Sequence, residues 1–188
     1  MRTELSEFEG LPRAHRDSLL LQEVASDIAA AAFSRGDFEM DSGEQTDYYI
    51  DKYVFESRPT ILRRLAELLA DRVPGDIDRL AAGDRGGVPL VTAVSLRSGL
   101  PFALIREVAG SQTVGTMGEI HRDERVVLIV DVVHSGRQAL CLANKLEELG
   151  VTVACIQAVV DRGADGEENI RRAGFSYDFL FSRSDLNI

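Results

Sequence analysis

The chain has 188 residues, of which 45% are hydrophobic and 28% charged, with a formal net charge of −10 at pH 7. This length and composition predict one globular domain, residues 1–188, with room for a full hydrophobic core. The acidic balance and the lack of a dense basic cluster argue against nucleic acid as a partner, and no apolar run approaches the ~18 residues of a membrane span.

The N-terminal half predicts alternating helices and strands. Residues 1–35 are expected to form an N-terminal helical segment, with an amphipathic helix over 18–33 that stops before Gly36. A short strand is expected near 48–53. The pattern then predicts a helix over 59–71, a strand over 78–82, a tight turn over 83–87, a helix over 88–97 and a strand over 102–106.

Residues 108–124 form a 17-residue segment with three glycines between two predicted strands. Structureless loops of this length are uncommon in compact domains, and many of them act as lids. We therefore expect a mobile loop here. A β-hairpin arm or a disordered crossover would fit the same pattern.

The C-terminal half predicts a βαβ unit, with a strand over 126–131, a helix over 138–149 and a strand over 151–160. Together the elements predict an α/β fold with a doubly wound, mainly parallel sheet flanked by helices. Cys141 and Cys155 fall in the helix and the last strand, so we expect buried, reduced thiols rather than a disulfide or a metal site.

Three turns follow strands of this sheet, at residues 83–87, 131–137 and 161–162. Ligands of open α/β sheets bind at the carboxyl ends of the strands, where these turns meet. Backbone N–H groups in the turn before the 138–149 helix suit an anion, and the carboxylate of Asp131 suits a sugar hydroxyl or a hydrated metal. An ordinary βα turn would give the same pattern, with Asp131 as a helix-capping carboxylate.

Residues 126–140, VVLIVDVVHSGRQAL, resemble the 5-phosphoribosyl 1-diphosphate (PRPP) loop of type I phosphoribosyltransferases. In that family an apolar strand ends in two acidic residues, and a Thr-Thr-Gly-Gly-type turn follows. Asp131 stands at the second acidic position and Val130 at the first. The turn of this chain is His134-Ser135-Gly136-Arg137.

Three further segments resemble orotate phosphoribosyltransferases, and all four keep the order of that family. FEMDSGEQTDYYID at 38–51 matches the family pattern at Ser42, Gly43, Tyr48, Tyr49 and Asp51. AGDRGGVPL at 82–90 resembles its Gly-Gly-x-Pro-Leu turn, and VDRG at 160–163 resembles its Val-Asp-Arg segment. Four ordered segments are more specific than any one of them.

The resemblance implies a type I phosphoribosyltransferase-like fold with a mobile hood over 108–124, a homodimer, PRPP and a pyrimidine base as substrates, and Mg²⁺ held through PRPP and water rather than by direct protein ligands. Apart from the resemblance, the N-terminus is polar and of mixed charge, unlike a signal peptide, so a cytoplasmic protein is the default expectation. It implies catalytic roles for Asp131 and Arg106. It also implies sites for the 5′-phosphate at Val133, His134, Ser135, Gly136, Arg137 and Gln138, for diphosphate at Asp84, Arg85, Gly86 and Gly87, and for the base at Arg162, Tyr48 and Tyr49.

Some of these residues have simpler interpretations. Arg162 would also suit a surface ion pair, and the two tyrosines a core or an interface. The chain also departs from the family pattern, with Asp41, Gly86 and Gly110 at positions where members carry lysine, which leaves His121 and Arg122 as the possible cations of the hood. Three functions stay open: an orotate enzyme, an enzyme of the same fold for another base, and a catalytically silent sensor of PRPP or a nucleotide.

Overall fold

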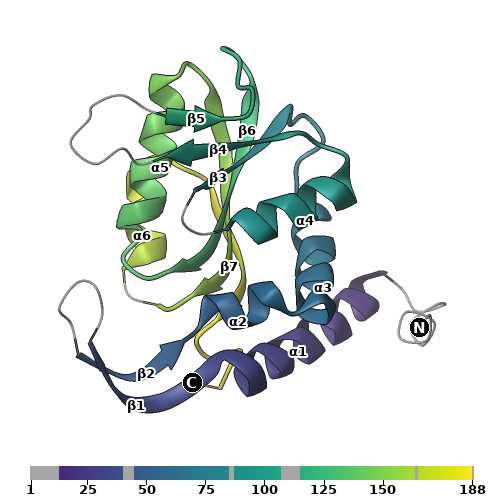
Figure 1. The fold of residues 1–188 in the computed structure, drawn as a ribbon, viewed down its shortest axis with the longest axis vertical. Coiled ribbons are helices and arrows are strands. Elements are labelled where there is room, and N and C mark those ends of the chain that lie inside the picture. The colour runs from purple at the N-terminus through teal and green to yellow at the C-terminus, as the bar shows by residue number, and fades with distance from the viewer. Residues whose placement is uncertain (1–12, 40–44, 85–86, 107–114, 164, 188) are drawn as a thin grey trace.

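The computed structural model describes residues 13–39, 45–84, 87–106, 115–163 and 165–187. A six-stranded sheet in the order β5-β4-β3-β6-β7-β8 forms its centre, and β1 and β2 form a separate hairpin (Figure 1). All neighbouring strands of the larger sheet are parallel except β4 and β5. The strands are β1 (Phe33–Glu39), β2 (Gln45–Ile50), β3 (Arg79–Gly83), β4 (Phe102–Arg106), β5 (Gly115–Met117), β6 (Arg125–Val133), β7 (Thr152–Asp161) and β8 (Tyr177–Ser182).

Helices cover both faces of the sheet, which confirms the doubly wound, mainly parallel architecture. In Figure 1, α3 and α4 lie on one side of the sheet and α5 and α6 on the other. The described helices are α1 (Arg13–Ala32), α2 (Lys52–Ser57), α3 (Pro59–Ala70), α4 (Val88–Ser98), α5 (Arg137–Glu148) and α6 (Gly166–Arg172). None of these described helices has the length and apolar character of a membrane span.

Strand β6 is apolar along most of its length because both of its faces are buried. Val127 and Ile129 belong to the core cluster on the α3 and α4 side, whereas Val126 and Leu128 belong to the cluster under α5. Side chains alternate between the two faces of a strand. Asp131, two residues after Ile129, is therefore directed toward the α3 and α4 side of the sheet, where α2 also packs.

The hairpin region differs in two places from the sequence-based expectation. Helix α1 ends at Ala32 and β1 begins at Phe33, so the last residues of the expected helical segment 1–35 are a strand. The strand expected over 48–53 ends at Ile50, and α2 takes its last residues. The physical reason is a helix cap, because the Asp51 carboxylate accepts a hydrogen bond from the Tyr53 N–H at 3.0 Å.

The expected single loop over 108–124 is wrong in its second half. Strand β5 lies within it and pairs antiparallel with β4, with Thr116 opposite Ile105, and Ile120 packs against the core cluster under α5. Backbone pairing and apolar contact fix this part as an added edge strand, as the hairpin-arm interpretation proposed. Residues 108–114 of the expected hood lie outside the described residues.

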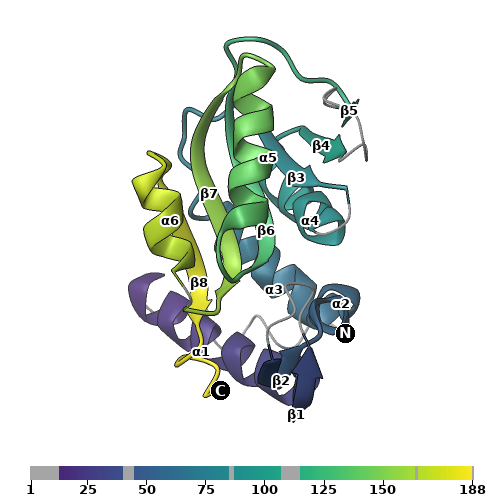
Figure 2. The ribbon, with the colours of Figure 1, turned by 90° about the vertical axis from the view of Figure 1, so that its left-hand side faces the viewer.

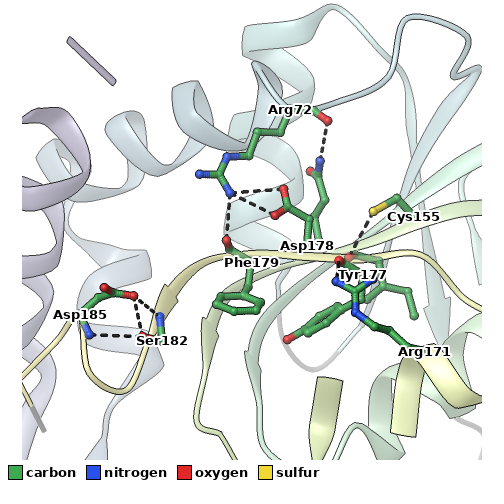
Figure 3. A network of polar contacts seen from close by, with 10 residues as sticks. Arg72, Cys155, Arg171, Tyr177, Asp178, Phe179, Ser182 and Asp185 are labelled. Atoms are coloured by element: carbon green, nitrogen blue, oxygen red, sulfur yellow. Dashed lines mark hydrogen bonds and ion pairs between the residues drawn. The ribbon is translucent and has the colours of Figure 1, made fainter. Parts of the chain in front are cut away.

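Strand β8, at the far edge of the sheet, is fastened by a polar network (Figure 3). Arg72 Nη1 donates to the two Asp178 carboxylate oxygens at 3.3 Å and to the Phe179 carbonyl at 2.9 Å. The Gln157 amide of β7 donates to the Arg72 carbonyl at 2.9 Å. The segment that follows α3 is thus tied to the C-terminal strands.

The two cysteines are free thiols, as expected, but they are not both buried. Cys155 is half-buried in β7, and burial raises the pKa of its thiol to about 11. Cys141 is exposed, contrary to the expectation, because it lies on the outer face of α5 between residues that face the core.

Candidate active site

The carboxyl ends of the parallel strands β3, β4, β6, β7 and β8 share one edge of the sheet, as strands of this kind must. The β1–β2 hairpin, α1 and α2 lie beyond this edge (Figures 1 and 2). Contacts from Tyr48 and Lys52 join the hairpin region to the edge. The candidate site is therefore built from two layers of the structure.

The turn between β6 and α5 forms an anion-binding geometry at this edge. Val133 ends β6, Gly136 adopts a positive φ of 76°, and α5 begins at Arg137. A Cβ on Gly136 would lie 3.0 Å from the Gly166 carbonyl oxygen, so both the conformation and the space favour glycine. The first N–H groups of a helix have no partner within the helix, so those of α5 can donate to an anion.

Helix α6 packs against this turn and supports its backbone. A Cβ on Gly166 would overlap the His134 carbonyl oxygen and would lie 2.8 Å from a methyl group of Val133. The Asn169 amide donates to the Ser135 carbonyl at 3.1 Å. Sequence analysis did not find α6 or these contacts, because the polar stretch GEENIRR contains one apolar residue and shows no helical period.

Asp131 lies within β6, 7% exposed, two residues before the strand ends. Its Oδ1 accepts a hydrogen bond from the Val132 N–H at 2.7 Å, and its Oδ2 lies 2.7 Å from Lys52 Nζ. Burial alone would lower the pKa of Lys52, but the Asp131 carboxylate outweighs burial and raises it above its ordinary value. Lys52 therefore carries its positive charge at neutral pH.

Glu56 follows Lys52 by one helical turn and points into the same region. It is 2% exposed, and neither carboxylate oxygen has a hydrogen-bond partner. Burial, reinforced by the nearby Asp131 charge, raises the pKa of Glu56 to about 7, against smaller lowering effects of Lys52 and the Gly87 amide. Sequence analysis missed both α2 residues. The available signals were that Lys52 directly follows the YYID motif and is one of only two lysines in the chain.

The ends of β3 and β4 meet through Asp84 and Arg106. Arg106 Nε lies 3.2 Å from Asp84 Oδ2, and the Asp84 N–H donates to the Ile105 carbonyl at 3.1 Å. Gly87 has a positive φ of 77° and precedes the first residue of α4. The contact brings a predicted catalytic residue next to the predicted diphosphate turn. Arg85 and Gly86 lie outside the described residues.

Arg162 lies at the end of β7 and contacts Tyr48 of the hairpin. Its Nε donates to the Tyr48 hydroxyl at 3.0 Å, and its guanidinium carbon lies 4.4 Å from the ring centroid. The Arg183 guanidinium, which sequence analysis missed, lies 4.8 Å from the same centroid. Tyr49 is not brought into this group, because it lies on the opposite face of β2 and packs against Phe38, with ring centroids 5.5 Å apart.

Asp161 fixes the backbone that carries Arg162. Its two carboxylate oxygens accept from the Gly163 N–H and from the Tyr177 hydroxyl, each at 2.7 Å. Burial and the bond to Asp161 raise the pKa of Tyr177 well above its usual range, so its hydroxyl remains a donor. The Arg162 N–H donates to the Val133 carbonyl at 2.9 Å. This backbone hydrogen bond joins the turn that carries Arg162 to the anion-binding turn.

The two possible hood cations lie elsewhere. Arg122 packs over Gly150, and the Asp123 N–H donates to the Gly150 carbonyl at 2.8 Å, which places this segment at the amino end of β6. Protein cations at the site therefore come from elements other than this segment.

Among the residues that the structure describes, no three His, Cys, Asp or Glu side chains are grouped to hold a metal ion.

Known proteins of similar sequence share one name, although no family model matches the chain. The chain is 33% identical over 168 residues to the orotate phosphoribosyltransferase of Methanocella arvoryzae, covering 88% of this chain and 95% of that protein. It is 36% identical over 159 residues to the orotate phosphoribosyltransferase of Natronomonas pharaonis, covering 84% and 91%.

Solved structures show the same fold at lower identity. The orotate phosphoribosyltransferase of Aeropyrum pernix matches with a TM-score of 0.77 and 23% identity, covering 88% of this chain and 95% of that one. The Mycobacterium tuberculosis H37Rv orotate phosphoribosyltransferase in complex with PRPP matches with a TM-score of 0.76 and 21% identity, covering 90% and 99%. At these identities the likeness concerns the fold, and it confirms the type I phosphoribosyltransferase-like class.

Proposed function

Because the chain belongs to the orotate phosphoribosyltransferase family, we propose that it transfers the phosphoribosyl group of PRPP to orotate, giving orotidine 5′-phosphate and diphosphate. The observation that carries this proposal is the convergence of Asp131, the 133–138 turn and Arg162 on one edge of the sheet. The reaction needs a carboxylate that binds the ribose hydroxyls, a turn that binds the 5′-phosphate, and a guanidinium that binds the carboxylate of orotate.

In the proposed reaction a ring nitrogen of orotate forms a bond to the anomeric carbon of PRPP. The bond from that carbon to diphosphate oxygen breaks, the electron pair leaves with diphosphate, and the nitrogen proton passes to solvent. Positive charge develops on the ribose ring in this loose displacement. Asp131 accepts hydrogen bonds from the ribose hydroxyls and its negative charge stabilises that ring, while the protein positions the reactants and excludes water.

The remaining roles follow from the geometry of each group. Backbone N–H groups of Val133, His134, Ser135, Gly136, Arg137 and Gln138 surround the 5′-phosphate, with the Ser135 hydroxyl as a further donor. The planar fork of Arg162 binds the base carboxylate through two parallel hydrogen bonds, and Tyr48 holds the guanidinium in place. Tyr49, on the other face of β2, takes no part.

Diphosphate binds between the Gly87 turn and Arg106 in this proposal. Asp84 orients Arg106, and Arg85 and Gly86 complete the turn on the sequence pattern alone. Mg²⁺ in this proposal is held by PRPP oxygens and water rather than by a protein cage, because this ion keeps several of its waters and uses few protein ligands. When bound, Mg²⁺ supplies positive charge against diphosphate. By family resemblance we also propose a homodimer, which light scattering would test.

A two-part assay tests the function. Purified protein with PRPP and Mg²⁺ is given orotate, uracil or a purine base, and diphosphate release is measured. We expect release with orotate alone, a severe loss of turnover in Asp131→Asn, and in Arg162→Ala a larger loss for orotate than for PRPP binding. Arg172→Ala, an exposed arginine on α6 that pairs with Glu168, is the matched control and leaves both unchanged.

The other two functions are separate outcomes of the same assay. Release with a different base would replace orotate as the substrate. Calorimetric binding of PRPP without release with any base would point to the silent sensor. The relatives do not favour either alternative, since the Methanocella arvoryzae and Natronomonas pharaonis proteins both carry the name orotate phosphoribosyltransferase.

A further inference from the structure

Lys52 occupies a position that none of the family-like motifs assigned to a ligand. It begins α2, directly after the YYID motif, and its ammonium lies 2.7 Å from the carboxylate expected to bind ribose. The Lys52 side chain is 27% exposed and that of Asp131 10%, so the pair lies at the boundary between the core and the site. A lysine with only a packing role has no need to place its charge at this boundary.

The geometry places Lys52 within reach of a sugar bound to Asp131. A hydroxyl that donates to Asp131 Oδ2 lies ~2.7 Å from that oxygen, hence no more than about 5.4 Å from the Lys52 ammonium. Lysine has a flexible four-carbon stem and three rotatable donors, so it can cross this distance without a backbone movement. Glu56, on the same face of α2, is close enough to the Gly87 amide for that amide to act on its pKa. Lys52, Asp131 and Glu56 therefore form a cluster that extends from the carboxylate expected to bind ribose to the turn expected to bind diphosphate.

The charges at this end of the sheet favour a movement of the Lys52 ammonium from Asp131 toward bound PRPP. Arg106 already pairs with Asp84 at 3.2 Å. Lys52 Nζ forms an ion pair with Asp131 Oδ2 at 2.7 Å. PRPP carries several negative charges, and a cation is drawn to phosphate oxygens more strongly than to one carboxylate. As ribose hydroxyls bond to Asp131, they also satisfy the oxygen that the ammonium leaves.

We infer that Lys52 is a PRPP-binding residue, whose ammonium pairs with Asp131 before PRPP binds and with an anionic oxygen of PRPP afterwards. The inference rests on the proposed phosphoribosyl transfer and adds to it a cation from the N-terminal layer of the fold. Lys52 then has two effects. It neutralises Asp131 while the protein is folded without substrate, and it delivers positive charge to the reacting end of PRPP.

The test begins with the unaltered protein, whose PRPP binding with Mg²⁺ and orotate turnover establish the function independently. Lys52→Met keeps the apolar stem and removes the charge, Lys52→Arg keeps the charge, and Lys145→Met makes the same change on α5, far along the helix from the turn. We expect Lys52→Met to raise KM and Kd for PRPP by about tenfold or more, with KM for orotate within about twofold. Lys52→Arg restores most of the loss, and Lys145→Met has no effect.

Salt dependence separates binding from a purely structural role. If Lys52 contacts PRPP, the affinity of Lys52→Met falls less steeply with added salt than that of the unaltered protein, because one charged contact has gone. If Lys52 only holds Asp131, the variant loses thermal stability and kcat while Kd for PRPP and its salt dependence stay unchanged. That second result overturns the inference and leaves the orotate function intact.

A measurement on the unaltered protein avoids any folding defect of the variants. The chain contains only two lysines, so reductive methylation followed by mass spectrometry reports Lys52 and Lys145 separately. PRPP with Mg²⁺ should slow methylation of Lys52 severalfold and leave Lys145 as an internal reference. Equal rates at Lys52 with and without PRPP, in protein that turns over orotate, overturn the inference alone. Protein that neither binds PRPP nor turns over orotate overturns the proposed function and the inference together.

Discussion

Replacing Glu56 by glutamine should change how the stability of the protein depends on pH. The carboxyl group is 2% exposed, has no hydrogen-bond partner, and has a pKa of about 7 instead of 4.5. At ~1.36 kcal/mol per pKa unit, this rise corresponds to about 3 kcal/mol. Glutamine has nearly the same shape and is neutral at every pH, so Glu56→Gln removes this one titration and little else.

The direction of the effect follows from proton linkage. Between pH 4.5 and about 7 the folded protein holds the Glu56 proton, whereas the unfolded chain has lost it. The free energy of unfolding therefore falls as pH rises through this window and is constant, for this group, above it. The difference between Glu56→Gln and the unaltered protein should grow by about 3 kcal/mol in favour of the variant from pH 4.5 to pH 8.

Urea unfolding at four pH values between 5 and 8.5 measures this difference directly. In thermal unfolding it corresponds to roughly 6–12 °C for a chain of this length. Glu148→Gln, an exposed glutamate at the end of α5, is the matched control for the loss of one carboxylate. Parallel pH curves for Glu56→Gln and the unaltered protein would refute the reasoning, since they would mean that Glu56 titrates alike in the folded and unfolded chains.

Three further predictions concern the site. PRPP brings negative charge near Glu56, so its binding at pH 8 should take up protons in calorimetry across buffers of different ionisation enthalpy, and Glu56→Gln should abolish the uptake. Gly166→Ala forces a Cβ onto the His134 carbonyl and should raise KM for PRPP, whereas Gly75→Ala meets nothing within 4 Å and should not. Tyr177→Phe removes a hydrogen bond to Asp161, so it should destabilise the fold by about 1 kcal/mol and raise KM for orotate more than for PRPP.

The parallel sheet could be predicted because burial on both faces leaves a plain signature in each central strand. Strands β4 and β6 are apolar runs bounded by turn residues, and their expected and observed limits differ by at most two residues. Strand β5 could not be predicted, because GTM is only three residues long and its pairing with β4 is a tertiary contact. The half-polar β8 likewise gives no clear period, and Arg72 of another segment fastens it.

The candidate site divides in the same way. Asp131 and Arg162 could be found because each comes just after an apolar run, in a recognisable local order. Lys52, Glu56 and Arg183 could not, because their significance lies in partners far along the chain. A lysine after a capped turn is unremarkable as sequence. It matters only because the fold brings the first residue of α2 to Asp131 of β6, where the two charges meet.

The contact between Arg162 and Tyr48 spans 114 residues of sequence, which has a consequence for how the protein is made. During synthesis the hairpin leaves the ribosome long before its partner, and at about 5–20 residues per second the delay is roughly 6–23 s. For that time the sheet edge that shields Tyr48, Lys52 and Glu56 is not yet present. Closing so long a chain segment also slows folding. The edge that carries the candidate site is thus among the last parts of the molecule to form, and ribosome-bound chains that end before residue 162 lack the contact between Arg162 and Tyr48.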